Sequence, residues 1–124
     1  MSRILIVEDN EKNRKLFKLV LGSIGHELLL AENGEEGIKT AEDERPELIL
    51  MDIQMPVMDG ISALKALKAA DETRDIPVVA LTSYAMKGDR ERLLDIGFTA
   101  YMAKPIDVDK FKKMVGEILE AGHE

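Results

Sequence analysis

Five polar residues of this 124-residue chain stand directly after short apolar runs, where a side chain can serve a chemical step. Glu8 and Asp9 follow "RILIV", Asp52 follows "ELILM", Thr82 follows "PVVAL" and Lys104 follows "AYMA". A carboxylate at the end of a buried apolar run is costly unless a partner compensates its charge. These positions therefore raise the question of what keeps the carboxylates ionised.

The types of these five residues suit one kind of chemistry. Carboxylates that meet at one point repel each other and raise each other's pKa, and a hard divalent cation removes that conflict. A lysine ammonium and a threonine hydroxyl can both donate to a phosphoryl oxygen. A carboxylate can also attack phosphorus to form an aspartyl phosphate. If the five residues converge, the set predicts magnesium-dependent phosphoryl transfer to Asp52.

Five apolar runs predict the strands that would bring these residues together. Several of the runs are apolar on consecutive residues, which is typical of strands covered on both faces of a parallel sheet. The predicted strands are residues 3–7, 27–31, 47–51, 77–81 and 100–103.

Helix-period segments alternate with these strands. Their apolar faces are Leu16, Phe17, Val20, Leu21 and Ile24, with a stop at Gly25; Ile38 and Ala41, between an N-cap at Asn33 and Glu44; Ile61, Leu64 and Leu67; Leu93, Leu94 and Ile96; and Phe111, Met114, Val115, Ile118 and Leu119, after a cap at Asp107. Strict alternation predicts an α/β, doubly wound (βα)5 fold with a five-stranded parallel sheet and helices on both faces. The ligand site of such a sheet lies beyond the carboxyl ends of the strands, where the five polar residues stand.

Composition narrows the class of protein. The chain is 45% hydrophobic and 33% charged, and its length suits one compact domain, residues 1–124. The absence of cysteine excludes disulfides, zinc–thiolate sites and a thiol nucleophile. A net charge of −7 argues against binding to nucleic acid or to an anionic membrane surface. With no membrane-length apolar run and no signal peptide in the sequence, a cytoplasmic protein is expected.

Four motifs, in order, carry a resemblance to a known family. "ILIVEDN", "LILMDIQMPVMDG", "VVALTSYA" and "AYMAKPI" together resemble the response-regulator receiver domain of two-component signalling, over essentially the whole chain. The resemblance implies a flavodoxin-like sheet with strand order 2-1-3-4-5. At this length we expect no output domain, and the chain is similar to single-domain receivers of the chemotaxis and cell-cycle (DivK-like) type. The terminal domains of hybrid histidine kinases are also very similar.

The resemblance implies a role for each strand-end residue. Asp9 would bind Mg²⁺ (or Mn²⁺) directly and Glu8 would bind it through water. Asp52 would be both metal ligand and nucleophile, and the backbone carbonyl of Gln54 would complete the protein ligands. Lys104 would hold a phosphoryl oxygen, and before phosphorylation it would pair with Asp52.

The resemblance also implies a switch. Thr82 and Tyr101 match a pair in which the hydroxyl moves toward the phosphoryl group and the aromatic side chain turns inward. The face formed by the fourth helix, the fifth strand and the fifth helix then changes its affinity for partners. Gln54 and Tyr84 occupy positions that tune hydrolysis of the aspartyl phosphate. The peptide bond before Pro105 is expected to be cis.

The expected partners are a histidine kinase and/or a histidine phosphotransfer protein, and a downstream protein target. We expect a monomer or weak dimer that catalyses only its own phosphorylation and dephosphorylation. A haloacid-dehalogenase-like phosphatase is an alternative, but it needs a second acid two residues after the nucleophile, where this chain has Gln54. Another is a receiver-type interaction module that phosphorylation does not regulate. Loss of Asp52 or Lys104 would indicate such a module, and both are present.

Overall fold

The computed structural model describes residues 2–55, 58–82, 89–104 and 106–122, so the predictions for Tyr84 and Pro105 lie outside the described residues. Strands and helices alternate along the chain. The elements are β1 (Arg3–Val7), α1 (Glu11–Gly22), β2 (Glu27–Ala31), α2 (Gly34–Glu44), β3 (Leu48–Asp52), α3 (Gly60–Ala69), β4 (Val78–Thr82), α4 (Asp89–Ile96), β5 (Ala100–Ala103) and α5 (Val108–Gly122). This order confirms the predicted (βα)5 fold.

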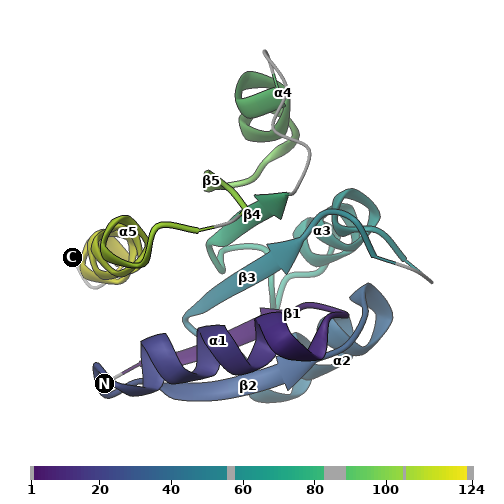
Figure 1. Cartoon of the computed structure of the whole chain (residues 1–124). Helices are drawn as coiled ribbons and strands as arrows, with labels where there is room; N and C mark the ends of the chain where they lie inside the picture. The colour runs from purple at the N-terminus through teal and green to yellow at the C-terminus, as the bar shows by residue number, and fades with distance from the viewer. Residues whose placement is uncertain (1, 56–57, 83–88, 105, 123–124) are drawn as a thin grey trace.

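The five strands form one parallel sheet in the order β2-β1-β3-β4-β5, as the resemblance implied. The chain leaves β1 for β2 on one side and returns to β3 on the other, so strand order reverses beside β1. Parallel strands place their carboxyl ends at one edge of the sheet, and the arrowheads of β1, β3 and β4 show this edge (Figure 1).

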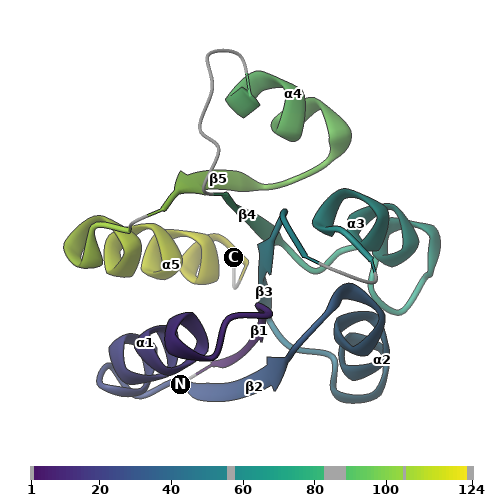
Figure 2. The same ribbon diagram turned by 45° about the vertical axis from the view of Figure 1, so that its right-hand side comes forward.

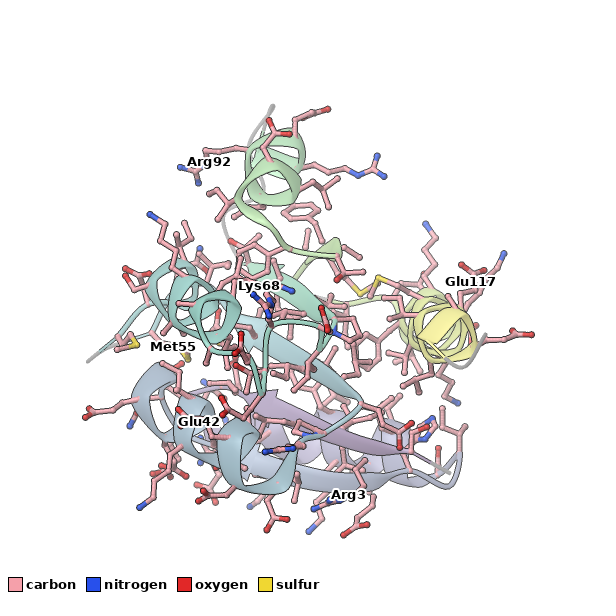
Figure 3. All side chains as sticks on the ribbon, turned by 180° about the vertical axis from the view of Figure 1, so that it is seen from behind. Arg3, Glu42, Met55, Lys68, Arg92 and Glu117 are labelled. Carbon is pink, nitrogen blue, oxygen red and sulfur yellow. The ribbon has the colours of Figure 1, made fainter. Side chains whose placement is uncertain are left out.

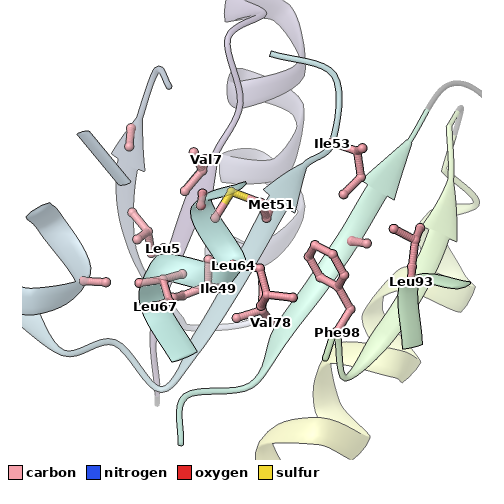
Figure 4. Packing of buried hydrophobic residues seen from close by; sticks show 14 residues of the cluster. Leu5, Val7, Ile49, Met51, Ile53, Leu64, Leu67, Val78, Leu93 and Phe98 are labelled. Atoms are coloured by element: carbon pink, nitrogen blue, oxygen red, sulfur yellow. The ribbon is translucent and has the colours of Figure 1, made fainter. Parts of the chain in front are cut away.

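Helices cover both faces of the sheet: α1 and α5 lie on one side, and α2 and α3 lie on the other (Figure 2). Alternate strand residues point to opposite faces, so each face has its own hydrophobic cluster. Ile4 and Ile6 pack with Phe17 and Phe111, whose ring centroids are 5.5 Å apart. The other cluster joins strand residues such as Leu5, Ile49 and Val78 to Leu64 and Leu67 of α3 (Figure 4).

Some predicted faces were wrong. The central strands β3 and β4 are buried at every residue, but β2 is an edge strand in which Leu30 is 39% exposed. Leu16, Ile24 and Leu94 are also exposed, although the helical period placed them on apolar faces. The first helix ends at Gly22, so Ile24 lies beyond it. Helical period identifies an apolar stripe, but it does not say how wide a stripe the sheet covers.

Side-chain caps fix where the helices begin. The predicted caps are present: Asn33 Oδ1 accepts from the backbone N–H of Glu36 at 2.9 Å, and Asp107 Oδ1 accepts from that of Lys110 at 3.1 Å. Asn10 caps α1 and Asp59 caps α3 in the same way. Such caps satisfy backbone donors that the first helical turn leaves unpaired. They start α1 and α3 close to the carboxyl edge of the sheet.

The outer surface is charged. Side chains such as Glu42 on α2, Arg92 on α4 and Glu117 on α5 project away from the sheet (Figure 3). Among the residues that the structure describes, no helix is both long and apolar enough to cross a membrane.

Candidate functional site

The predicted site residues converge at the carboxyl edge of the sheet. β3 and β4 each end one residue later than predicted, so Asp52 and Thr82 are the last residues of their strands. Asp52 pairs in the ladder with Leu81, and the N–H of Ile53 donates to the carbonyl of Leu81 at 2.9 Å. Asp52 is only 3% exposed. Backbone pairing on a central strand therefore fixes the position of this carboxylate.

Three carboxylates form an acidic cluster there. Glu8, Asp9 and Asp52 each offer an oxygen, and these three oxygens lie within 4.8 Å of one another. Glu8 is fully buried, Asp52 is buried and Asp9 is exposed. Mg²⁺ prefers oxygen ligands, takes few of them from protein and keeps several waters. A cluster with two buried carboxylates and one on the solvent side fits that ion.

Lys104 provides the positive charge of the site. Its Nζ lies 3.0 Å from each carboxylate oxygen of Glu8 and 3.2 Å from Asp52 Oδ2. Its backbone N–H donates to the carbonyl of Thr82 at 2.8 Å, which ties it to the end of β4. The ion pair with Asp52 was expected, whereas the two contacts with Glu8 were not. One ammonium group is thus shared between two buried carboxylates.

Asp52 has a pKa raised from 3.8 to about 7. Burial is the largest cause, followed by the hydrogen bond and the negative charge of Glu8, while Lys104 acts in the opposite direction. Two carboxylates therefore compete for one ammonium, and the competition favours a proton on Asp52. A divalent cation at the cluster would favour the ionised carboxylate instead.

Gln54 connects Asp52 to Thr82. Its backbone N–H donates to Asp52 Oδ1 at 3.1 Å, and its Nε2 donates to Thr82 Oγ1 at 2.6 Å. The Thr82 side chain is almost fully buried. The hydroxyl at the end of β4 is thus held by a side chain from the loop after β3. Sequence reasoning assigned roles to both residues but did not predict this bond.

Sequence reasoning missed two residues on the first turns of α1. Asn13 Nδ2 donates to Glu8 Oε1 at 2.7 Å, and the Arg14 guanidinium donates to the carbonyl of Glu8 at 2.7 Å. Arg14 also pairs with Glu32 at 3.3 Å. The sequence contained a signal for both residues, because a helix that begins just after β1 has its first turns beside the end of that strand. These contacts help to hold Glu8 in place.

Gly60 lets the loop after β3 pack against the strand end. A Cβ on Gly60 would lie 2.6 Å from the carbonyl oxygen of Asp52 and 3.0 Å from Cα of Ile53, and both atoms belong to the backbone. Any side chain here would displace the segment that carries Asp52. The glycine of "MDG" is therefore required by a close approach.

Tyr101 lies away from the acidic cluster, on β5. It pairs with Ala80 in the ladder, and its half-buried side chain packs against the hydrophobic cluster that includes Leu93 and Phe98. The adjoining Thr82–Ala103 pair connects β5 to the site. The structure thus places Tyr101 on a strand that is coupled to Thr82 through the sheet.

Comparison with known proteins agrees with this geometry. The family model of the response regulator receiver domain matches residues 4–116. The polar-differentiation response regulator DivK of Brucella anthropi is 47% identical over 116 residues, which cover 94% of each chain.

Solved structures give the same result. The receiver domain of a sensor histidine kinase from Pseudomonas aeruginosa PAO1 is 35% identical, with a TM-score of 0.88 over 96% of this chain and 98% of that one. That structure holds a magnesium ion in its active-site cleft. A receiver domain of a histidine kinase from Syntrophus aciditrophicus is 31% identical, with a TM-score of 0.89 over 98% of this chain and 92% of that one.

The chain belongs to the response regulator receiver family, the phosphoacceptor domains of two-component signalling. Within the family it is similar to DivK over nearly its whole length. It is a signalling domain rather than an enzyme that turns over a separate substrate, and membership of the family implies a histidine kinase as partner.

Proposed function

We propose that Asp52 is the phosphoacceptor and takes its phosphoryl group from a phosphohistidine of a histidine kinase or histidine phosphotransfer protein. The observation that carries this proposal is the convergence of three carboxylates and the Lys104 ammonium at the end of β3. Asp52 sits at the centre of that group, because it contacts Lys104 and Glu8 and is bonded to the backbone of Gln54.

The transfer exchanges one bond to phosphorus for another. A carboxylate oxygen of Asp52 attacks phosphorus, a P–O bond forms, and the P–N bond to the donor imidazole breaks. The imidazole leaves with the electron pair of that bond. The Lys104 ammonium and the Thr82 hydroxyl hold oxygens of the incoming phosphoryl group, which places charge and donors where negative charge develops.

We further propose that Asp9 and Asp52 hold Mg²⁺ directly, with the carbonyl of Gln54 as a ligand and Glu8 acting through water. Mn²⁺ would use the same oxygen donors. The raised pKa of Asp52 supports this assignment, because the protein alone leaves the carboxylates incompletely compensated. When bound, the cation neutralises the carboxylates and stabilises charge on the transferring group.

The proposed output is a switch from Thr82 to Tyr101. A phosphoryl group on Asp52 competes with Gln54 for the Thr82 hydroxyl, which is held at 2.6 Å in this structure. Movement of Thr82 changes the space behind it on β5, where Tyr101 lies. The face formed by α4, β5 and α5 then shifts between two states, and a downstream protein target that prefers one state reads the signal.

Acetyl phosphate tests this function. We expect incubation with acetyl phosphate and Mg²⁺ to add one phosphoryl group to the wild-type chain and to Asp43→Asn, an exposed control on α2. Asp52→Asn should remain unmodified, and removing the metal should abolish labelling. Intact mass spectrometry measures all three. Failure of the wild-type chain to accept phosphate with any donor or metal would favour the interaction-module alternative.

A further inference from the structure

An open groove of about 700 Å³ lies between the C-terminal half of α1 and the start of β2. Lys15, Lys18 and Leu19 line it from α1, and His26 and Leu28 line it from β2 and the turn before it. We call it the α1–β2 groove. None of these residues belongs to the site described above.

The α1–β2 groove has an apolar surface that the fold leaves uncovered. Leu19 is 73% exposed, which is unusual for a whole leucine side chain, and Leu28 is half-buried. Leu30 points to the same side of β2 as Leu28 and is also exposed. The groove is open at Gly22, where a Cβ would meet no atom within 4 Å. Scattered exposed leucines are normal, but Leu19 and Leu28 line one depression.

Two lysines of α1, Lys15 and Lys18, line this surface in a chain whose net charge is −7. Lys15 is paired with Glu11 at 3.3 Å, but both side chains are at least 70% exposed, so the pair is weak and can yield to a better partner. The nearby Glu27 lies 3.8 Å from Arg3. The groove is thus apolar with a basic rim on an acidic protein.

The groove lies at the opposite end of the sheet from Asp52. Leu19 is eight residues after Glu11, about 12 Å further along the helix at 1.5 Å per residue. Asn13, near the start of α1, contacts Glu8 at the site, whereas the last turn lies over the start of β2, away from its arrowhead (Figure 1). A ligand in the groove would leave the phosphoacceptor edge open.

We infer that the α1–β2 groove binds an acidic amphipathic helix of a partner protein. Apolar side chains at helical spacing would pack on Leu19 and Leu28, and flanking carboxylates would contact Lys15 and Lys18. A two-fold dimer through the groove would instead bring the lysines of both copies together. An anionic membrane would repel the net charge of −7. Since binding there needs no phosphoryl group, the inference is independent of the proposed role of Asp52.

A designed peptide tests the groove directly. The probe is a helical peptide with leucine on one face and glutamate on the flanks, titrated into ¹⁵N-labelled protein. Amide shifts are expected to concentrate at the groove, around residues 15–28, and binding should weaken as salt rises. Leu19→Ser and the double variant Lys15→Glu/Lys18→Glu should each lower affinity about tenfold or more. The charge-matched control is the double variant Lys39→Glu/Lys65→Glu, which changes two exposed lysines on α2 and α3 and should bind as the wild type does.

Several outcomes overturn the inference. These are no shifts at millimolar peptide, shifts centred elsewhere, or an equal response to a scrambled peptide of the same composition. Self-association that Leu19→Ser abolishes in sedimentation would assign the groove to a second copy. Binding to phosphatidylglycerol vesicles that the lysine variant abolishes would assign it to lipid. Leu19→Ser should accept phosphate from acetyl phosphate like the wild type, which separates this test from that of Asp52.

Discussion

The groups around Asp52 have opposing effects on the pKa of its carboxyl group. Burial and Glu8 raise its pKa to about 7, and Lys104 and the backbone N–H of Gln54 favour the ionised form. The metal-free protein thus holds Asp52, the proposed nucleophile, close to the point where it gains a proton at neutral pH. Anything that adds positive charge to the cluster shifts the carboxylate toward its reactive form.

This balance predicts a pH-dependent effect of Asp52→Asn on stability. The pKa of Asp52 is 3.8 in an ordinary carboxyl and about 7 in the fold, so folding favours the protonated group. Its contribution to stability is full below pH 3.8 and is lost as pH rises through about 7. In EDTA, the gain in unfolding free energy from Asp52→Asn should grow by about 2 kcal/mol between pH 5 and pH 8.

Urea denaturation of both chains at the two pH values measures this growth. Asp43→Asn serves as the control and should show no such trend, because that residue is exposed on α2. An effect of Asp52→Asn that is the same at pH 5 and pH 8 would contradict the account of the acidic cluster.

The position of Gln54 predicts that its substitution changes the lifetime of the phosphorylated chain. Its side-chain amide donates to Thr82 Oγ1 and its backbone N–H donates to Asp52 Oδ1, where water must approach an aspartyl phosphate. We expect Gln54→Ala to lengthen the half-life of the phosphorylated chain about fivefold, the equivalent of one hydrogen bond of about 1 kcal/mol. Decay of the adduct in Mg²⁺, followed by mass spectrometry, measures it. An unchanged half-life would remove Gln54 from hydrolysis, and a shorter one would contradict the prediction by showing that the side chain protects the aspartyl phosphate.

At the scale of elements, the loop between β3 and α3 depends on one close approach. Gly60→Ala should destabilise the protein by about 2 kcal/mol or more, because its Cβ would meet the backbone of Asp52 and Ile53. Gly116→Ala on α5 is the matched control: nothing lies within 4 Å, and alanine favours a helix by up to about 1 kcal/mol. Thermal or urea unfolding compares them. Equal effects of the two substitutions would show that the Gly60 contact is not restrictive.

The elements show what could be predicted from the sequence and what could not. Alternating apolar runs and caps such as Asn33 and Asp107 sufficed for element order, and strand ends sufficed to bring Asp52 and Lys104 together. Side-chain contacts such as Lys104–Glu8 and Gln54–Thr82 were beyond reach, because they depend on rotamers and on segments distant in sequence.

The sequence also did not predict how far each apolar side chain is buried. The helical period placed Leu16 and Ile24 on the apolar face of α1, but the sheet covers a narrower stripe and the helix ends before Ile24. The apolar run of β2 is similar to those of the central strands, and its edge position follows from the strand order that the resemblance implied and the structure confirms. Coverage depends on the neighbours of an element, which its own sequence does not specify.

At the scale of the whole molecule, the acidic cluster should couple metal binding to folding. A ligand that binds only the folded state stabilises it by about 1.4 kcal/mol at ten times its Kd. We expect Mg²⁺ to raise the Tm of the wild-type chain and of Asp43→Asn, and to have little effect on Asp9→Asn. Scanning calorimetry with and without Mg²⁺ measures the shift. Equal shifts in all three proteins would place the ion elsewhere.

The measurement that tests the central claim most directly is the position of the phosphoryl group in the phosphorylated chain. After reaction with a phosphohistidine donor protein and Mg²⁺, borohydride reduction converts an aspartyl phosphate to homoserine, which peptide mass spectrometry locates. We predict homoserine at residue 52 in the wild-type chain and none at any position in Asp52→Asn. Homoserine at Asp9 or at another acidic residue, or a phosphorylated Asp52→Asn chain, would contradict the assignment of Asp52.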